Sequence, residues 1–403
     1  MALIVQKFGG SSVADRDRIF NVARIVANTH AAGNDVVVVV SAQGDTTDDL
    51  IAKAGEITHD PSQREMDMLL ATGEQISISL LAMALGETGC PAISLTGWQA
   101  GFHTDRAYTR ARIKNLDTER IESELSKNRV VVVAGFQGLN RYDDITTLGR
   151  GGSDTSAVAI AAALHADLCQ IYTDVDGVYT ADPRLVPRAR KLDEITFDEM
   201  LELASLGAQV LNNRSVELAK KFRVDLEVLS SLERKPGTKV KEVTKVEKTT
   251  IAGVAKDTSI ARIALIGLRH NPGVAFQVFD LLSKHNINVD LILQSIGRED
   301  SKDISFTVHE KDLEDAQEIL TENQEVLCFD HIEVDGNIGK VSIVGAGLMT
   351  NCGMAARMFE ALYEAGINIQ MINTSEIRVS VLLDEGDVDR AVRAIHAKFF
   401  DEI

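Results

Sequence analysis

Residues 35–41 have the sequence DVVVVVS, in which five consecutive valines stand between an aspartate and a serine. Because no polar residue alternates with the valines, both faces of this strand are expected to be covered by other elements. Similar β-branched runs occur at 3–8, 130–134 and 168–173, separated by segments with helical period. This alternation predicts an α/β domain with a largely parallel central sheet. The expected helices of this domain are 15–31, 47–58, 65–88 and 153–165.

Composition limits the partners and the location of the protein. The 403 residues include 42 Lys and Arg against 60 Asp and Glu, a formal net charge of −18. Recognition of nucleic-acid phosphates needs a concentrated basic surface, and no basic run is present, so no nucleic-acid partner is expected. No uninterrupted apolar run approaches the roughly 20 residues of a membrane span, and the first residues lack a signal-peptide core. We therefore expect a cytoplasmic protein without a membrane partner, and the spacing of the four cysteines indicates neither a metal site nor a disulfide framework.

A different pattern follows a charged segment at 231–249. Residues 261–295 and 341–375 match without gaps at a constant offset of 80 residues, which defines an internal repeat. Each copy predicts a βαββα unit, and the first continues into a fourth strand near 325–334. Since the second copy reaches Ile403 just after its last helix, we expect residues 250–255 to supply its fourth strand, so that the two copies interleave. The expected parts are a domain at 1–230, a linker at 231–249, and two repeat domains at 250–335 and 336–403.

Two glycine loops stand where a strand is expected to meet a helix. The first is KFGGSS at 7–12 and the second is GRGGSD at 149–154. Backbone N–H groups and a helix N-terminus at such loops can hold a phosphate, and Lys7 and Arg150 add full positive charges. A plain turn explains the first loop equally well, and a helix cap by Ser153 or Asp154 is compatible with the second. Because both loops follow strands of one sheet, they are expected to form one ligand site.

Two further segments invite a ligand assignment. The segment TDVDGVYTADPR at 173–184 contains three acidic residues and a DG turn, but it lacks the register of a calcium-binding EF-hand. A solvated hairpin remains the alternative for this segment. The segment at 345–350 resembles a dinucleotide fingerprint, yet Thr350 stands where the third glycine belongs, so nucleotide binding is not expected there.

Taken together, five motifs in chain order resemble the aspartate kinase branch of the amino acid kinase family. They are KFGGSS at 7–12, SAQGDTTD at 41–48, GEQIS at 73–77, LGRGGSD at 148–154 and TDVDGVYTADPR at 173–184. The repeats, with NPG at 271–273 and NTSEIR at 373–378, resemble the tandem ACT domains of the same enzymes, which have a ferredoxin-like α+β fold. The resemblance implies transfer of a phosphoryl group from ATP, with Mg²⁺, to the side-chain carboxylate of L-aspartate. The product would be 4-phospho-L-aspartate, the precursor of lysine, threonine and methionine.

The resemblance also implies roles for individual residues. The implied catalytic pair is Lys7, which stabilises the migrating phosphoryl group, and Asp154, which organises that lysine. Besides Lys7, the residues implied in ATP binding are Gly9, Gly10, Ser11, Ser153, Thr173, Asp174, Tyr179 and Arg184. Those implied in aspartate binding are Glu74 for the ammonium group, Arg150 for the α-carboxylate, and Ser41 and Thr47. The chain departs from the family pattern at Gln209 and Asn212-Asn213, where many members carry lysine and His-Pro.

The ACT resemblance implies effector sites for lysine, threonine or both. The matching positions are Asn271, Gly273, Val274, Ala275 and Gln294 in the first copy, and Met354, Ala355, Ser375 and Glu376 in the second. Some lysine-sensitive relatives carry threonine at the position of Ala355. The family also favours a homodimer through the ACT domains or a hetero-tetramer with a shorter ACT-only subunit; no methionine lies between Met200 and Met349 to start such a subunit.

Two alternatives remain from the sequence. One is an enzyme of the same fold that phosphorylates glutamate, N-acetylglutamate or carbamate. The other is an amino-acid sensor that combines ACT domains with an inactive kinase fold. Lys7, Arg150 and Asp154 are all present, which speaks against the sensor.

Overall fold

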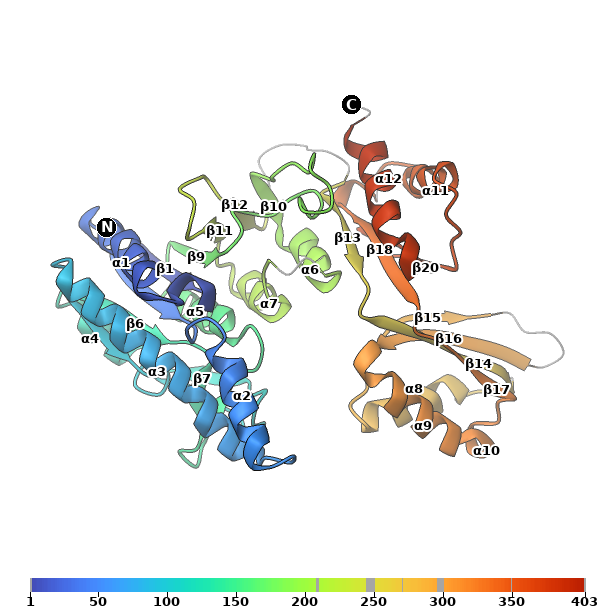
Figure 1. Cartoon of the computed structure of the whole chain (residues 1–403), viewed down its shortest axis with the longest axis horizontal. Helices are drawn as coiled ribbons and strands as arrows, with labels where there is room; N and C mark the ends of the chain where they lie inside the picture. The colour runs from blue at the N-terminus through green and yellow to red at the C-terminus, as the bar shows by residue number, and fades with distance from the viewer. Residues whose placement is uncertain are drawn as a thin grey trace. The chain divides into compact units, whose positions relative to one another are not determined.

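The computed structural model describes residues 2–207, 210–243, 251–269, 271–295, 301–348 and 350–401. These residues form two compact units (Figure 1). The first unit comprises the chain up to Tyr179, Lys191–Ser205 and the residues from 210 to 243, and the second comprises Thr180–Arg190, residues 206–207 and the C-terminal part from residue 251. The units therefore do not follow a single sequence boundary near residue 230.

The first unit is built on an eight-stranded sheet in the order β10-β12-β11-β9-β1-β2-β6-β3. All neighbouring strands are parallel except β11 and β12, which pair antiparallel. The largely parallel sheet expected from the valine run is confirmed, since all five valines of β2 are fully buried. The strands are β1 (Leu3–Phe8), β2 (Asp35–Val40), β3 (Ala92–Leu95), β6 (Val130–Ala134), β9 (Leu168–Thr173), β10 (Glu194–Thr196), β11 (Leu226–Ser230) and β12 (Thr238–Lys241).

Helices pack against this sheet and close its core. Val36, Val38 and Val40 of β2 join an apolar cluster with residues of α1 and α3, while α5 contacts β1, β2 and β9. Because successive side chains of a strand point to opposite faces, a strand covered on both sides needs apolar residues at every position. The helices are α1 (Arg16–Ala31), α2 (Thr46–Ile57), α3 (Gln63–Glu87), α4 (Glu119–Leu125), α5 (Gly152–Ala163), α6 (Phe197–Ser205) and α7 (Asn213–Phe222), and a 3₁₀ turn, η1, spans Gly10–Val13.

A second, smaller sheet of the first unit has the order β5-β4-β7-β8. It is tied to α3 by Asp67, whose carboxylate accepts hydrogen bonds from the backbone N of Thr109 (2.9 Å) and the hydroxyl of Thr147 (2.6 Å). The strands are β4 (Phe102–Thr104), β5 (Ile113–Leu116), β7 (Gln137–Leu139) and β8 (Ile145–Thr147).

Helix α3 is long and apolar enough, by length and composition, to cross a membrane. Half of that apolar segment is buried inside the first unit, where α3 contacts α1, β3 and β6. The buried face includes the polar residues Asp67 and Glu74, which are 0% and 3% exposed. These contacts identify α3 as a core helix of the unit.

The second unit contains two four-stranded sheets, one for each repeat. The first sheet has the order β15-β16-β14-β17 and the second has the order β13-β18-β20-β19. The strands of the two sheets are β13 (Gly253–Asp257), β14 (Ile260–Arg269), β15 (Val289–Gln294), β16 (Ser301–His309), β17 (His331–Asp335), β18 (Ile338–Val344), β19 (Met371–Thr374) and β20 (Arg378–Asp384). Its helices are α8 (Val274–Lys284), α9 (Leu313–Glu322), α10 (Gln324–Leu327), α11 (Met354–Glu364) and α12 (Val388–Phe400).

One edge strand of the second repeat comes from the chain before the first repeat. Strand β13 precedes the first repeat, but it pairs antiparallel with β18 of the second, from Gly253 opposite Val344 to Asp257 opposite Lys340. This strand, Gly253–Asp257, begins three residues after the start of the expected segment 250–255. In the first repeat the expected strand 325–334 is shorter, because residues 324–327 form α10 and the strand starts only at His331.

Residues 180–190 pack with the second repeat, although they lie between β9 and β10 near the middle of the chain. Ala181 and Val186 join the apolar cluster of α11 and α12. Thr180 anchors the segment through its carbonyl, which accepts from Val254 N (2.8 Å), and through its hydroxyl, 2.9 Å from His396 Nε2. Burial lowers the pKa of His396, which favours a neutral imidazole in this contact.

Candidate active site

A buried ion pair lies at the carboxyl end of the central sheet. Lys7 on β1 and Asp154 in the first turn of α5 are each 9% exposed, and Lys7 Nζ lies 2.7 Å from Asp154 Oδ1. Within the sheet, Lys7 is opposite Val39 of β2 and Ile171 of β9. Such a pair holds a positive charge at a defined place in a region of reduced solvent exposure.

The first glycine loop follows β1 directly and forms the turn into η1. Gly9 N donates to the carbonyl of Tyr172 (3.3 Å), and the carbonyl of Gly10 accepts from Gly44 N (3.0 Å). A Cβ added at Gly10 would lie 2.7 Å from the carbonyl oxygen of Ala42. Only glycine therefore allows the loop after β1 to approach the loop after β2 this closely. The ends of β1, β2 and β9 are therefore adjacent, and they bring together Gly9, Gly10, Ser11, Ser41, Thr173 and Asp174.

The second glycine loop leads into α5. Helix α5 begins at Gly152, Ser153 in its first turn is buried, and Arg150 just before it is exposed. Asp154 is also in the first turn, where the helix dipole favours a negative charge. Since Asp154 contacts Lys7, both glycine loops border the same region, as expected from the sequence.

Glu74 of α3 is a buried carboxylate beside the end of β2. Its Oε1 accepts a hydrogen bond from Ala42 N at 3.1 Å, and its Oε2 has no hydrogen-bond partner among the described residues. Burial raises the pKa of Glu74 to about 7, against the lowering effect of the bond from Ala42. Ser41 precedes Ala42, and Thr47 lies in the first turn of α2; both are half-buried. This group can receive a cation that would complete the hydrogen bonding of Glu74.

The segment after β9 divides between the two units. Thr173 Oγ1 contacts Asp174 (2.9 Å), and the hydroxyl of Tyr179 donates to Asp176 (2.7 Å), which raises the pKa of Tyr179 to about 12. Asp176 also pairs with Lys191 at 3.1 Å. These residues belong to the first unit, whereas Arg184 belongs to the second and pairs with Asp182 at 2.8 Å. The structure thus groups the other nucleotide candidates in one unit and leaves Arg184 in the other.

Some residues that shape this region have no motif of their own. Asp67, Asn212 and Arg214 contact the segment 109–151 that carries Arg150. Asp67 and Arg214 are identified only by their position in the folded chain, because an isolated polar residue on a helix carries no periodic signal. Asn212 stands where the chain departs from the family pattern. Gln209, where the chain departs from the family pattern, lies outside the described residues.

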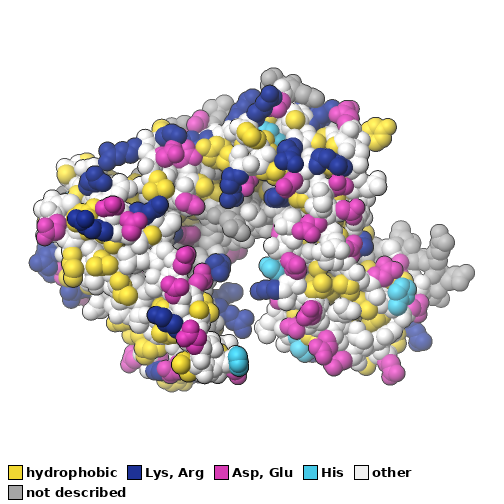
Figure 2. Space-filling model, viewed as in Figure 1, with side chains coloured by type: hydrophobic (Ala, Val, Ile, Leu, Met, Phe, Trp, Pro, Cys, Tyr) yellow, Lys and Arg dark blue, Asp and Glu magenta, His cyan; other side chains and the backbone are white. Residues whose placement is uncertain are grey.

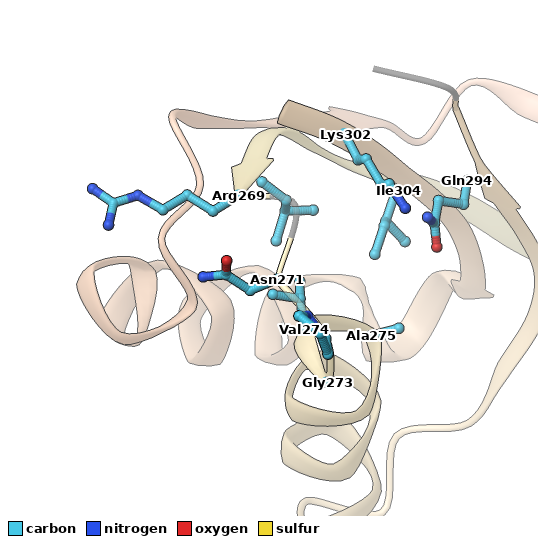
Figure 3. Close-up of a pocket in the computed structure, with 10 residues that line it drawn as sticks. Arg269, Asn271, Gly273, Val274, Ala275, Gln294, Lys302 and Ile304 are labelled. Carbon is cyan, nitrogen blue, oxygen red and sulfur yellow. The ribbon is translucent and has the colours of Figure 1, made fainter. Parts of the chain in front are cut away.

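A second candidate site is a cavity of about 420 Å³ in the first repeat. All five effector positions expected in this repeat, Asn271, Gly273, Val274, Ala275 and Gln294, line it. Figure 3 shows the start of α8 on one side, with Gln294 and Lys302 projecting from neighbouring strands; Arg269 extends away from the other labelled side chains. Sequence reasoning missed Lys302, which reaches the cavity because β14 and β16 pair with Leu268 opposite Lys302.

The positions expected in the second repeat lie at the start of α11 and in the turn between β19 and β20. Met354 and Ala355 begin α11 and pack against the apolar cluster of that repeat. Ser375 and Glu376 form the turn between β19 and β20, and Ser375 N donates to Arg378 O at 2.8 Å. Gly345 N donates to Ile377 O (3.0 Å), so this turn lies beside the loop that leads from β18 to α11.

The described part of the chain contains no cluster of metal ligands, and its surface charges are mixed on the face drawn in Figure 2. Among the described residues, no three His, Cys, Asp or Glu side chains come together as metal ligands. On the face drawn in Figure 2, Lys and Arg side chains are interspersed with Asp and Glu. That face offers no concentrated basic surface for a nucleic acid.

Comparisons with known proteins extend over the whole chain. The profile of the amino acid kinase family matches residues 2–230, and that of the ACT domain matches 263–324 and 341–399. An aspartokinase from Bacillus sp. (strain MGA3) is 51% identical over 400 residues, which cover 99% of this chain and 97% of that protein. E. coli aspartokinase III in complex with aspartate and ADP (R-state) superposes with a TM-score of 0.86 at 28% identity, covering 99% of this chain and 100% of the other. The same enzyme with lysine and aspartate (T-state) gives a TM-score of 0.77 at 28% identity, with 99% of both chains covered.

Proposed function

The chain belongs to the amino acid kinase family as an aspartate kinase with tandem ACT domains, and from this premise we propose how its residues carry out and regulate the reaction. The enzyme converts ATP and L-aspartate to ADP and 4-phospho-L-aspartate, the first step of lysine, threonine and methionine biosynthesis. It is thus a phosphotransferase with a carboxyl group as acceptor.

Lys7 is the residue that stabilises the transferred phosphoryl group. The β-carboxylate of aspartate is already ionised at neutral pH, so the reaction needs no general base. Phosphoryl transfer depends instead on positioning and on neutralising the charge of the equatorial oxygens. The observation that carries this assignment is the 2.7 Å contact of buried Lys7 with Asp154, beside two glycine loops. Asp154 keeps the ammonium group at the strand ends, where backbone N–H groups also converge.

Glu74 and Arg150 select aspartate by its charges. The unpartnered Oε2 of Glu74 suits the ammonium group of the substrate, because an ammonium donor supplies the hydrogen bond that this buried oxygen lacks. Arg150 is exposed at the turn before α5 and offers the planar fork that binds a carboxylate through two hydrogen bonds. Ser41 and Thr47 close the pocket from the loop after β2.

ATP lies along the glycine loops and the end of β9. Gly10, Ser11 and Ser153 supply backbone and hydroxyl donors to the phosphates, and Gly9, whose N–H donates to Tyr172 O, leaves space for them beside Lys7. Thr173, Asp174 and Tyr179 contact the nucleoside end, and Arg184 is the further residue that the family resemblance assigns to the phosphates. The phosphates themselves would hold Mg²⁺, with Asp154 or Asp174 as the available carboxylates. The donors fit that ion, since Mg²⁺ is commonly bound by one or two carboxylates with phosphates and waters. When bound, Mg²⁺ neutralises phosphate charge.

Lysine, threonine or both act as feedback effectors at the ACT domains. Support for an effector site comes from the 420 Å³ cavity lined by all five residues expected in the first repeat. E. coli aspartokinase III has been solved with lysine. An effector shifts activity only if it binds the inactive state more tightly than the active one.

The edges of the ACT sheets support self-association. Strands β15 and β19 are edge strands of their sheets, and Ile292, Leu293 and Ile372 on them are 45–48% exposed. An exposed apolar edge favours pairing with another sheet. We propose a homodimer through these edges; a complex with a shorter ACT-only subunit is the competing assembly. We also propose a cytoplasmic location, because α3 is accounted for as a core helix.

The decisive experiment is to trap the acyl phosphate with hydroxylamine after incubation with L-aspartate and MgATP. Reactions with lysine, threonine or both added identify the effector. Product that forms from aspartate and is suppressed by an effector supports the assignment. Product from glutamate, N-acetylglutamate or carbamate at a higher rate would contradict the substrate assignment. Effector binding without turnover of any of these would support the sensor alternative.

A further inference from the structure

Asn212 joins the start of α7 to the turn that carries Arg150. Its side-chain Oδ1 accepts a hydrogen bond from Arg214 N at 3.0 Å and caps the helix. Its Nδ2 donates to the backbone carbonyl of Arg150 at 3.2 Å. The two partners define the orientation of the amide, because a backbone N–H only donates and a carbonyl only accepts.

The contact with the turn is tight as well as polar. Gly151 has φ +70°, and a Cβ added there would lie 2.3 Å from Asn212 Nδ2 and 2.4 Å from its Cγ. Only glycine therefore allows the amide of Asn212 to pack directly against this turn. A shift of Asn212 would move the backbone on both sides of the Arg150 carbonyl.

Arg214, two residues further along α7, holds the strand that leads into the same turn. Its Nη1 donates to Leu148 O at 3.1 Å and its Nη2 to Ala111 O at 2.9 Å. Ala111 N in turn donates to Thr147 O at 2.8 Å. Residues 147–151 are thus held by Asn212 and Arg214 at two carbonyl groups, those of Arg150 and Leu148, and indirectly through Ala111, which binds both Arg214 and Thr147.

The Arg150 side chain itself has no such support. It is exposed, and among the described residues its guanidinium has no hydrogen-bond or ion-pair partner. In the absence of substrate, its direction is set only by the backbone from which it projects. The backbone contact of Asn212 is therefore the closest side-chain restraint on that direction.

We propose that Asn212 is a positioning residue that orients Arg150 toward the α-carboxylate of aspartate. The proposal rests on the role of Arg150 given under Proposed function. A binding group whose backbone already holds it in the productive direction loses less entropy when substrate binds. Small displacements of such a group weaken binding strongly. Loss of the contact should act on aspartate and much less on ATP.

Asn212→Asp separates the two functions of the side chain. An aspartate caps a helix about as well as an asparagine, so the bond from Arg214 N is kept. It has no N–H donor, so its second oxygen faces the carbonyl of Arg150 and repels it. We expect the KM for aspartate to rise about tenfold, with the KM for ATP within about twofold and the melting temperature within about 2 °C of the wild type.

Asn213→Asp is the matched control. It adds the same charge one residue along the helix, where Asn213 contacts Ser205 (2.9 Å). We expect both KM values of this control to stay near those of the wild type. An equal rise in the KM for aspartate in both variants would overturn the proposal in favour of a general charge effect. So would an unchanged KM in Asn212→Asp, or a fall in melting temperature with both KM values raised together.

Arg150→Lys distinguishes failure of this proposal from failure of the assignment beneath it. If Asn212 acts through Arg150, Asn212→Asp should change the KM for aspartate less than about twofold in the Arg150→Lys background, because coupled sites are not additive. If Arg150→Lys alone leaves that KM unchanged, the assigned role of Arg150 is wrong. If Arg150→Lys raises the KM and the two substitutions add fully, only the positioning role of Asn212 is overturned.

Discussion

At the residue scale, the buried Lys7–Asp154 pair predicts effects on both catalysis and stability. Lys7→Met removes the cation and leaves the Asp154 carboxylate buried without its partner. We expect kcat to fall by at least about 10²-fold, as for loss of other groups that stabilise transition-state charge. The free energy of unfolding should fall by up to about 3–5 kcal/mol, because a buried charge is left unpaired.

Stability and catalysis can be separated at this pair. Lys7→Met/Asp154→Asn removes both charges and should recover much of the stability in a urea titration while remaining inactive in the hydroxylamine assay. Effector binding should persist in both variants. Turnover close to that of the wild type in the double variant would exclude a catalytic role for Lys7.

The raised pKa of Glu74 predicts that aspartate binding and stability depend on pH. Burial raises its pKa to about 7, so in the free enzyme it is protonated below that pH and accepts an ammonium group poorly. The KM for aspartate should therefore rise as the pH falls from 8 to 6. The folded state also binds a proton that the unfolded state releases above about pH 4.5, so Glu74 lowers the stability as the pH rises from about 4.5 to about 7.

Glu74→Gln tests both parts of this prediction. The variant should bind aspartate weakly at every pH and lose the pH dependence of the KM. At pH 8 it should be more stable to urea than the wild type, by roughly 1–3 kcal/mol, since no buried charge has to form. A variant whose KM still rises toward acid pH would assign the titration to another group.

At the element scale, the start of α8 and the strands facing it form a cavity with a positive lining. Lys302 lines it, whereas the Arg269 side chain is directed away from the other lining residues (Figure 3), and among the described lining residues none is acidic. Together with the N-terminus of α8, Lys302 favours the carboxylate of an amino-acid effector. Lys302→Glu should raise the effector concentration for half-inhibition at least about tenfold.

The control for this reversal is Lys284→Glu, at the other end of α8. Lys284 is exposed and pairs with Asp280, so it carries the same charge away from the cavity. The measurement is the ratio of inhibited to uninhibited rate over an effector titration. An equal shift in both variants would show that net charge, and not the cavity, controls effector affinity.

At the scale of the whole molecule, Lys340 connects the two repeats within the second unit. It lies on β18, is 2% exposed, and its Nζ is 2.5 Å from Asp290 of β15 and 3.6 Å from Asp257. Lys340→Met would leave these two carboxylates close together without a cation. We expect the second unit to lose about 1–3 kcal/mol of stability, less than for a fully buried pair because Asp290 is partly exposed.

The matched control is Lys256→Met, which breaks the exposed pair between Lys256 and Asp389. Exposed pairs contribute about 0–1 kcal/mol, so its unfolding midpoint should hardly change. Urea unfolding followed by hydrogen exchange of the ACT amides measures both variants. Equal losses would mean that burial of Lys340 adds nothing to the connection between the repeats.

Self-association is the second prediction at this scale. Leu293→Lys places a charge on the exposed edge strand β15, where it should oppose pairing with another sheet. We expect light scattering to give the mass of a monomer for the variant and of a dimer for the wild type. A dimer in both would move the interface away from this edge.

The sequence by itself determined the architecture and the meeting of the two glycine loops. The valine run could only be a strand buried on both faces, which requires helices on each side of a parallel sheet. The two glycine loops had to meet, because the carboxyl ends of parallel strands share one edge of a sheet. The internal repeat likewise predicted two similar α+β sheets, since both copies carry the same apolar periodicity.

Tertiary structure alone decided the connections that depend on long-range contacts. Residues 180–190 pack with the second repeat because Ala181 and Val186 find an apolar cluster there, which no local pattern specifies. Lys302 reaches the effector cavity only through the register of β14 and β16. From the sequence, Asn212 is only a departure from the family pattern, and its hydrogen bond to the Arg150 carbonyl exists only because α7 folds back onto a turn 62 residues earlier in the chain. Periodicity encodes which face of an element is buried, whereas the partner of a single polar atom depends on how the elements pack.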